Sequence, residues 1–188
     1  MRLFTGVGLP ETVSGMLAAL AERLRPHAAI RWSAEANLHI TTKFIGEWPE
    51  NRLTELVSAL RETEWGTGFV VHLESLGWFP NPHQPRIFLV RARPEEPMAE
   101  LAARTNRSLA ALGIEPEARP YHPHITLARI PPRRPAVDLA PLRRAVAGIE
   151  APELGRFDCS SFHLYESRQE KGGSVYTKLA SFPLQQLP

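Results

Sequence analysis

The chain has 188 residues and a mass of 21.0 kDa, of which 43% are hydrophobic and 22% are charged. These proportions are typical of a globular domain, and they exclude a collagen-like, coiled-coil or disordered chain. The 22 basic and 20 acidic residues leave a net charge of only +2, which permits an anionic ligand without requiring one.

Apolar runs and cysteine usage indicate the compartment. No apolar run approaches the roughly 18 residues of a membrane span, and the first residues lack the apolar core of a secretory signal. The single cysteine, Cys159, cannot form an internal disulfide or a thiolate metal site alone. We therefore expect a soluble, cytoplasmic domain over residues 1–188, without membrane contact and acting as a monomer.

Strands and helices alternate along the first half of the chain. Apolar spacing and proline positions predict a strand at 2–9, a helix at 11–25, a short strand at 30–32, a strand at 38–45 and a helix opened by Pro49 that ends near residue 63. The unit of strand, helix, strand and helix is then complete.

The second half repeats this order with extra strands. The pattern predicts strands at 69–76 and 86–91, a helix from Met98 to Leu112, a strand at 122–130, a helix at 139–146, and strands at 156–166 and 174–182. Because two adjacent strand pairs can form hairpins, we predict an α+β fold with largely antiparallel sheets.

The tripeptide His-Ile-Thr occurs twice, at 39–41 and at 124–126, which is 85 residues later (124 minus 39). Both copies lie in a predicted strand that follows a helix, and Ile45 aligns with Ile130 when the comparison is extended. Self-similarity of this kind indicates a repeated structural unit. We interpret it as an internal duplication.

Each triplet pairs an imidazole with a hydroxyl. Successive strand residues point to opposite faces, so the His and the Thr share one face while Ile40 or Ile125 points into the core. If a pseudo-two-fold axis relates the halves, two imidazoles and two hydroxyls converge on one small volume. A neutral imidazole can accept a proton, an imidazolium can donate one, and hydroxyls can hold phosphate oxygens. This set suits phosphoryl chemistry and requires no cofactor.

Other histidines offer a metal site as an alternative. His122 and His124 are two residues apart on one strand, and His163 could supply a third imidazole. No Asp, Glu or Cys accompanies them, and a metal ligand does not need the hydroxyl two residues later, so we disfavour a zinc site. The remaining histidines are expected to be solvated, and they are His27, His72 and His83.

Phe44 and Arg129 occupy equivalent positions, each five residues after a motif histidine. An odd offset places them on the face opposite the histidines unless a bulge intervenes. Periodicity alone therefore assigns Phe44 to the core and Arg129 to solvent. The functional alternative is that Phe44 stacks on a base and Arg129 contacts a phosphate.

The chain resembles the two-histidine phosphoesterase superfamily, and within it the RNA 2′,3′-cyclic phosphodiesterases, also called 2′-5′ RNA ligases. The resemblance is carried by NLHITTKFIGE, YHPHITLARI and the closing segment FHLYESRQEKGGSVYTKLASFPL. It implies two pseudo-symmetric lobes of antiparallel sheet with outer helices around a central cleft. It also implies hydrolysis of a 2′,3′-cyclic phosphate to a 2′-phosphate without a metal, with 2′-5′ ligation as the reverse reaction.

The resemblance also assigns roles to individual residues. His39 would donate a proton to the departing O3′, and His124 would accept one from water. Thr41 and Thr126 would anchor the phosphate. Arg129 would contact the phosphate and Phe44 the base, against the spacing argument.

Two alternatives stay open. The same chemistry could act on a small nucleotide or on an ADP-ribose cyclic phosphate, or the chain could be a nucleotide-binding or RNA-binding module without turnover. Both histidines and both threonines are intact, which argues against binding alone. His122 stands where relatives often carry Arg or Phe, so we expect it to be particular to this chain.

Overall fold

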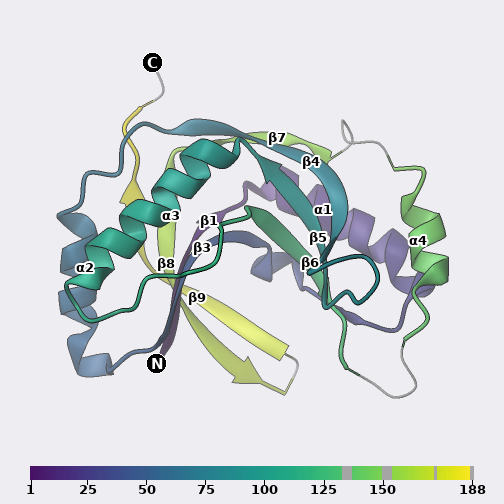
Figure 1. The fold of residues 1–188 in the computed structure, drawn as a ribbon, viewed down its shortest axis with the longest axis horizontal. Helices are drawn as coiled ribbons and strands as arrows, with labels where there is room; N and C mark the ends of the chain where they lie inside the picture. The colour runs from purple at the N-terminus through teal and green to yellow at the C-terminus, as the bar shows by residue number, and fades with distance from the viewer. Residues whose placement is uncertain (133–136, 150–153, 172, 187–188) are drawn as a thin grey trace.

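The described part of the chain, which leaves out residues 133–136, 150–153, 172 and 187–188, forms one curled sheet with helices outside it (Figure 1). This computed structural model has nine strands, which are β1 (Arg2–Gly8), β2 (Arg31–Trp32), β3 (His39–Glu47), β4 (Phe69–Phe79), β5 (Ile87–Arg93), β6 (His124–Arg129), β7 (Arg156–Cys159), β8 (Ser161–Glu170) and β9 (Gly173–Pro183). The α-helices are α1 (Glu11–Leu24), α2 (Leu53–Arg61), α3 (Glu95–Ala110) and α4 (Ala140–Val146).

The strand order shows two matching halves. It runs β9-β8-β1-β3 on one side and β6-β5-β4-β7 on the other, and all pairings between these strands are antiparallel. The halves meet where β3 pairs with β6. The short strand β2 also pairs with β6. The predicted α+β class with antiparallel sheet in two lobes is confirmed.

The duplication extends through nearly every element. Adding 85 to the residue numbers of β1 gives 87–93, which is the range of β5, and the same shift brings α1 onto α3 and α2 onto α4. Each half of the chain also contributes a strand to the other half. Strand β4, which follows α2, pairs with β5, and β8, which follows α4 and β7, pairs with β1. The two lobes are therefore built from interleaved halves of the chain.

The helices form two pairs on the outside of the sheet. Helices α2 and α3 pack together and α3 lies against β3, whereas α1 packs against α4, so that Figure 1 shows one pair on each side. Helix α1 begins directly after Pro10 and buries Val13, Leu17, Leu20 and Leu24 at helical spacing. Each fully buried apolar side chain of this kind contributes about 1.5 to 3 kcal/mol to stability.

The predicted strand at 156–166 is wrong as a single element. The structure divides it into β7 and β8, with Ser160 between them; β7 is the edge strand of one half of the sheet, and β8 lies between β1 and β9 in the other half. The buried positions change phase at this point, from Phe157 and Cys159 to Phe162 and Leu164. The chain leaves the edge strand β7 and within one residue enters β8, the second strand from the opposite edge, which requires the sheet to curl.

Among the helices that the structure describes, none is both long enough and apolar enough to cross a membrane.

Candidate active site

The two motifs meet at the centre of the sheet. Ile40 pairs directly with Ile125 across β3 and β6, and both side chains are fully buried. Because neighbouring strand residues alternate in direction, the flanking residues of both strands project together on the other face. We call this surface the histidine face, and its motif side chains are those of His39, Thr41, His124 and Thr126.

Both imidazoles are oriented by a backbone carbonyl two residues earlier. Nδ1 of His39 lies 2.8 Å from the carbonyl oxygen of Asn37, and Nδ1 of His124 lies 2.7 Å from that of His122. A carbonyl oxygen only accepts, so in both rings Nδ1 carries the proton and donates it. In the neutral form, Nε2 is then left with a lone pair. The Thr41 hydroxyl, 2.9 Å away, can donate to Nε2 of His39.

His39 is enclosed by aromatic rings. Its ring centroid lies 4.7 Å from that of Phe4 and 5.2 Å from that of Tyr176, which meets it edge-on. The ring of Tyr165 stacks on that of Phe4, with 5.0 Å between the two centroids. Burial is the main cause that lowers the pKa of His39 to about 4.

Positive charges surround His124. Burial lowers its pKa first, and the charges of Arg129, His122 and Arg91 lower it further. The charge of Arg129 acts on His39 as well, so this guanidinium lies near both motif histidines. The lowered pKa values favour the neutral form of both imidazoles at pH 7, and the charges of Arg129 and Arg91 lie beside them.

A bulge in each motif strand overturns the spacing argument for Phe44 and Arg129. The register shifts at Thr42 between β1 and β3, and at Leu127 between β5 and β6, which are equivalent positions in the two halves. Two consecutive residues are buried there in each strand, so the next residue returns to the histidine face. Phe44 is accordingly 60% exposed and not part of the core.

The assignment of Arg129 to open solvent is corrected for the same reason. Its side chain is exposed, as the spacing predicted, but it stands on the histidine face and its charge reaches both motif histidines. Phe44 lies beside Phe4, with 6.4 Å between the ring centroids, on the same face. The structure thus brings all six residues of the expected site to one surface.

His163 does not join His122 and His124. The strands β1 and β3 separate β8 from β6, and three strand spacings of about 4.8 Å amount to roughly 14 Å. The Nδ1 of His163 instead lies 3.0 Å from the hydroxyl of Ser181. Within the described ranges, no group of three or more His, Cys, Asp or Glu side chains is arranged to hold a metal ion.

Four further residues on the histidine face went unrecognised as site residues in the sequence. Phe4, Tyr165 and Tyr176 surround His39, and Arg91 pairs with His124 across β5 and β6. They lie far from the motifs in the sequence and are brought to them only by strand pairing. The signal available was the repeat itself, because the shift of 85 residues aligns β1 with β5 and so identifies both neighbours of the motif strands.

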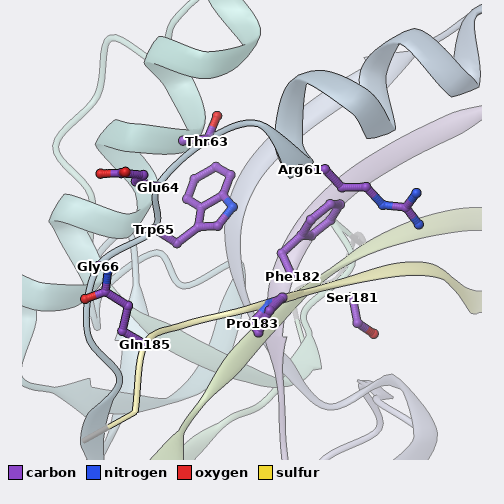
Figure 2. Close-up of a pocket in the computed structure, with 9 residues that line it drawn as sticks. All are labelled: Arg61, Thr63, Glu64, Trp65, Gly66, Ser181, Phe182, Pro183 and Gln185. Carbon is purple, nitrogen blue, oxygen red and sulfur yellow. The ribbon is translucent and has the colours of Figure 1, made fainter. Parts of the chain in front are cut away.

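The cavity in Figure 2 lies outside the histidine motifs. It has a volume of about 320 Å³, and neither motif histidine lines it. The residues around it are Arg61, Thr63, Glu64, Trp65, Gly66, Ser181, Phe182, Pro183 and Gln185. Trp65 and Phe182 belong to the buried core, so this hollow is the outer rim of the packing between α2 and β9.

The fold and the paired motifs define a two-histidine phosphoesterase. The family described as LigT like phosphoesterase matches the chain twice, over residues 7–89 and 90–176, in agreement with the duplication. The chain therefore belongs to the LigT-like phosphoesterase family.

Relatives and solved structures agree with this family. The chain is 34% identical to an RNA 2′,3′-cyclic phosphodiesterase of Thermus thermophilus, over 98% of this chain and 90% of that protein. It is 27% identical to one of Methanothermobacter thermautotrophicus, over 98% and 99%. The crystal structure of TT0787 of T. thermophilus matches with a TM-score of 0.77, at 29% identity over 99% of both chains. That of E. coli LigT complexed with 3′-AMP matches with a TM-score of 0.78, at 26% identity over 98% of both.

Proposed function

We propose that this chain hydrolyses the 2′,3′-cyclic phosphate ends of RNA or oligonucleotides to 2′-phosphates by paired histidine acid–base catalysis without a metal. The observation that carries the proposal is the pairing of Ile40 with Ile125, since it sets the two His-x-Thr pairs side by side on one face. The names of the relatives, RNA 2′,3′-cyclic phosphodiesterases, support the choice of substrate.

In the proposed reaction, water attacks the phosphorus and the bond to O3′ breaks. Nε2 of His124 accepts the proton of the attacking water, and Nε2 of His39 donates a proton to the departing O3′. Thr41 and Thr126 hydrogen-bond the non-bridging oxygens, and Arg129 offsets their negative charge. After the step, His39 is neutral and His124 is charged, and exchange of one proton with solvent restores the starting state.

The low pKa of His39 has a consequence for this cycle. A proton donor must be charged, yet His39 in the free enzyme is neutral at pH 7. A bound phosphate carries negative charge, which favours the imidazolium and raises the pKa. Substrate binding therefore supplies the proton affinity that His39 lacks, and the free enzyme stays uncharged at this position.

The same site accommodates ligation. If a 5′-hydroxyl takes the place of water, His124 accepts its proton and the cyclic phosphate opens to a 2′-5′ phosphodiester with the same loss of O3′. Phe44, exposed on the histidine face, would stack on a base of either substrate. We further propose a cytoplasmic location for the enzyme, in keeping with its single buried cysteine.

Turnover assays test the proposal directly. Cytidine 2′,3′-cyclic phosphate and a cyclic-ended oligonucleotide are incubated with the dialysed enzyme in EDTA, and the product is analysed for a 2′-phosphate. We expect turnover of both. Loss of activity on chelation, restored by zinc or manganese, would contradict the mechanism. Turnover of only ADP-ribose cyclic phosphate or another small cyclic phosphate would contradict the proposed RNA substrate. Tight binding without turnover would support the alternative of a nucleotide-binding or RNA-binding module.

A further inference from the structure

Arg91 extends the histidine face beyond the two motifs. It lies on β5 and pairs with His124, so both side chains project on the same face. The pairings place it in one row that crosses the sheet from β4 to β8. In order, the row consists of Ser75, Arg91, His124, Thr41, Gly6 and His163.

The charge of Arg91 is available for a ligand. Arg93, two residues further along β5, is bound to Glu74 at 3.0 Å and lies 3.3 Å from Glu95. Among the residues that the structure describes, no carboxylate lies within ion-pair distance of Arg91, and its side chain is exposed. Of these two arginines on one strand, only Arg93 has its charge offset by the protein itself.

Gly77 makes room for this side chain. A Cβ added to Gly77 would lie 3.2 Å from Nε and 3.5 Å from Nη2 of Arg91, so the guanidinium rests against the backbone of β4. A side chain at this position would crowd both the guanidinium and Cδ1 of Leu89, which is also 3.2 Å from the added Cβ. The guanidinium therefore packs against the backbone of β4 at Gly77.

The other half of the molecule has no equivalent cation. The shift of 85 residues aligns Arg91 with Gly6, which also lies beside a motif strand. A Cβ on Gly6 would lie 3.2 Å from Cδ2 of His39, so this histidine covers the glycine. The two sides of the histidine face are thus unlike, with aromatic rings around His39 and an arginine beside His124.

Arg91 stands to one side of the reacting phosphate. The charge of Arg129 lowers the pKa of both motif histidines, which places it near the centre, whereas that of Arg91 lowers only the pKa of His124. Strand β5 lies one strand spacing, about 4.8 Å, further than β6 from the junction between β3 and β6. A group bound to Arg91 is therefore a neighbour of the scissile phosphate and distinct from it.

We propose that Arg91 binds a second phosphate of the substrate, the one on O5′ of the nucleoside that carries the cyclic end. This inference rests on the proposed function and deepens it. A guanidinium binds phosphate oxygens with two parallel hydrogen bonds, so it suits a phosphodiester of RNA or a terminal 5′-phosphate. The site is then built for substrates with a phosphate on this side and discriminates against the bare nucleoside cyclic phosphate.

The test compares three substrates with and without Arg91. They are cytidine 2′,3′-cyclic phosphate, its 5′-phosphorylated form and a cytidine dinucleotide with a cyclic end. In Arg91→Ala, we expect the KM of the two substrates with a second phosphate to rise about tenfold or more. The KM of the first substrate should change at least about fivefold less, since it lacks the group that a charge-assisted hydrogen bond would hold. Arg91→Lys should raise these KM values less than Arg91→Ala does, because the ammonium group keeps the positive charge but not the two parallel hydrogen bonds of the guanidinium.

Further readouts separate binding from a structural role. Removal of one phosphate contact should reduce the salt dependence of log KM for the dinucleotide by about 0.7 per decade of salt. Gly77→Ala should reproduce part of the KM change by displacing the guanidinium. Arg93→Ala is the matched control on the same strand, and it should leave the ratio of KM values between substrates unchanged. The two phosphorylated substrates distinguish an RNA phosphodiester from a terminal phosphate.

Defined outcomes overturn the inference. Equal losses on all three substrates with a shifted pH profile would show that Arg91 acts through His124, and unchanged kinetics on all three would show that it binds nothing. If the wild-type enzyme turns over none of them, the proposed function fails. The inference is then decided by the dissociation constants of cytidine 2′-phosphate with and without a 5′-phosphate, measured by calorimetry for the wild type and Arg91→Ala.

Discussion

Ile40 and Ile125 face one another where β3 meets β6, and neither side chain is exposed. Their Cβ atoms point into the core, so the residues on either side of each are fixed on the opposite face. Residues directly opposite in an antiparallel pair have Cβ atoms only about 4.5 to 5.5 Å apart. The spacing of the two His-x-Thr motifs is thus determined by hydrophobic packing on the opposite side of the sheet.

The first prediction concerns this pair. Ile125→Ala should cost about 2 to 5 kcal/mol of unfolding free energy, because it leaves a cavity under both motifs. It should also lower turnover, since small displacements of catalytic groups have large effects on rate. Leu142→Ala removes an equally buried side chain from α4, a helix that packs against α1. Urea unfolding and turnover should show similar stability losses for the two variants, with a loss of turnover only in Ile125→Ala.

The second prediction concerns the two histidines. His39→Ala and His124→Ala should each reduce kcat by about 10² to 10⁴-fold, which is the usual contribution of a general acid or base. The double variant should lose less than the product of the single losses, because the two act in one step. Circular dichroism checks that the fold is retained. Near-normal turnover of either single variant would rule out the paired assignment.

The third prediction concerns pH. The pKa of His39 is about 4 in the folded protein and about 6.5 in an unfolded chain, so on acidification the unfolded state binds its proton first. His39 therefore contributes no penalty above pH 6.5 and destabilises the fold increasingly as the pH falls from 6.5 to 4, by up to about 3 kcal/mol. In urea titrations, the unfolding free energy of His39→Gln minus that of the wild type should therefore increase as the pH falls from 6.5 to 4.

The pKa of His39 should also respond to a bound anion. Inorganic phosphate should raise the pKa of His39 in the folded protein, because the bound anion favours the imidazolium. Nuclear magnetic resonance of the imidazole carbons, recorded with and without phosphate, measures the shift. A pKa that stays near 4 at saturating phosphate would remove His39 as the proton donor at neutral pH.

Local patterns in the sequence were enough to predict the elements and the motifs. Alternation placed His39 and Thr41 on one face, and the second triplet at 124–126 indicated the duplication that the strand order confirms. Apolar spacing located each α-helix that the structure describes to within a few residues, because each buries one apolar face. These features depend on residues close together in the chain.

The alternation changes phase at two bulges, and there it misplaced Phe44 and Arg129. The bulge at Leu127 is visible in the sequence as two successive apolar residues, Leu127 and Ala128, before Arg129. The equivalent bulge in the first copy is hidden by the polar pair Thr42 and Lys43, both of which are buried. Partners across strands, such as Arg91 with His124, depend on the pairing of distant segments, which no local pattern contains.

The fourth prediction concerns the two residues that the bulges bring back to the histidine face. Phe44→Ala should raise the KM for cyclic-ended oligonucleotides by about 5 to 150-fold, in line with a stacking contribution of about 1 to 3 kcal/mol per base. Phe44→Trp should retain affinity. Because stacking tolerates every base, the four cyclic nucleotides should give similar KM values in the wild type.

Arg129 has a distinct expected effect. Because its charge reaches both motif histidines, Arg129→Ala should lower kcat or raise KM for mononucleotide and oligonucleotide substrates alike. Loss of this cation should also move the pKa values of His39 and His124 upward. Arg144→Ala, on the exposed side of α4, serves as the control for a change of net charge. Unchanged kinetics of Arg129→Ala on both substrates would refute the phosphate contact.

The fifth prediction concerns Gly6, over which the imidazole of His39 lies. A Cβ at this position would come within 2.8 Å of the carbonyl oxygen of Ile40 and 3.2 Å of Cδ2 of His39, so β1 and β3 must separate or the ring must move. Gly6→Ala should cost about 1 to 3 kcal/mol of stability through overpacking. Turnover should fall by up to about 10²-fold, because His39, the proposed proton donor, is displaced.

A control glycine separates the steric effect from the loss of backbone freedom. Nothing lies within 4 Å of a Cβ added to Gly148, and its φ is not in the left-handed region, so Gly148→Ala should leave both stability and turnover close to wild type. Thermal unfolding and turnover of the two variants are compared under the same conditions. If Gly6→Ala kept full activity and stability, the contact between His39 and Gly6 would not be what holds the imidazole in place, and its hydrogen bond to Asn37 and the rings of Phe4 and Tyr176 would have to do so.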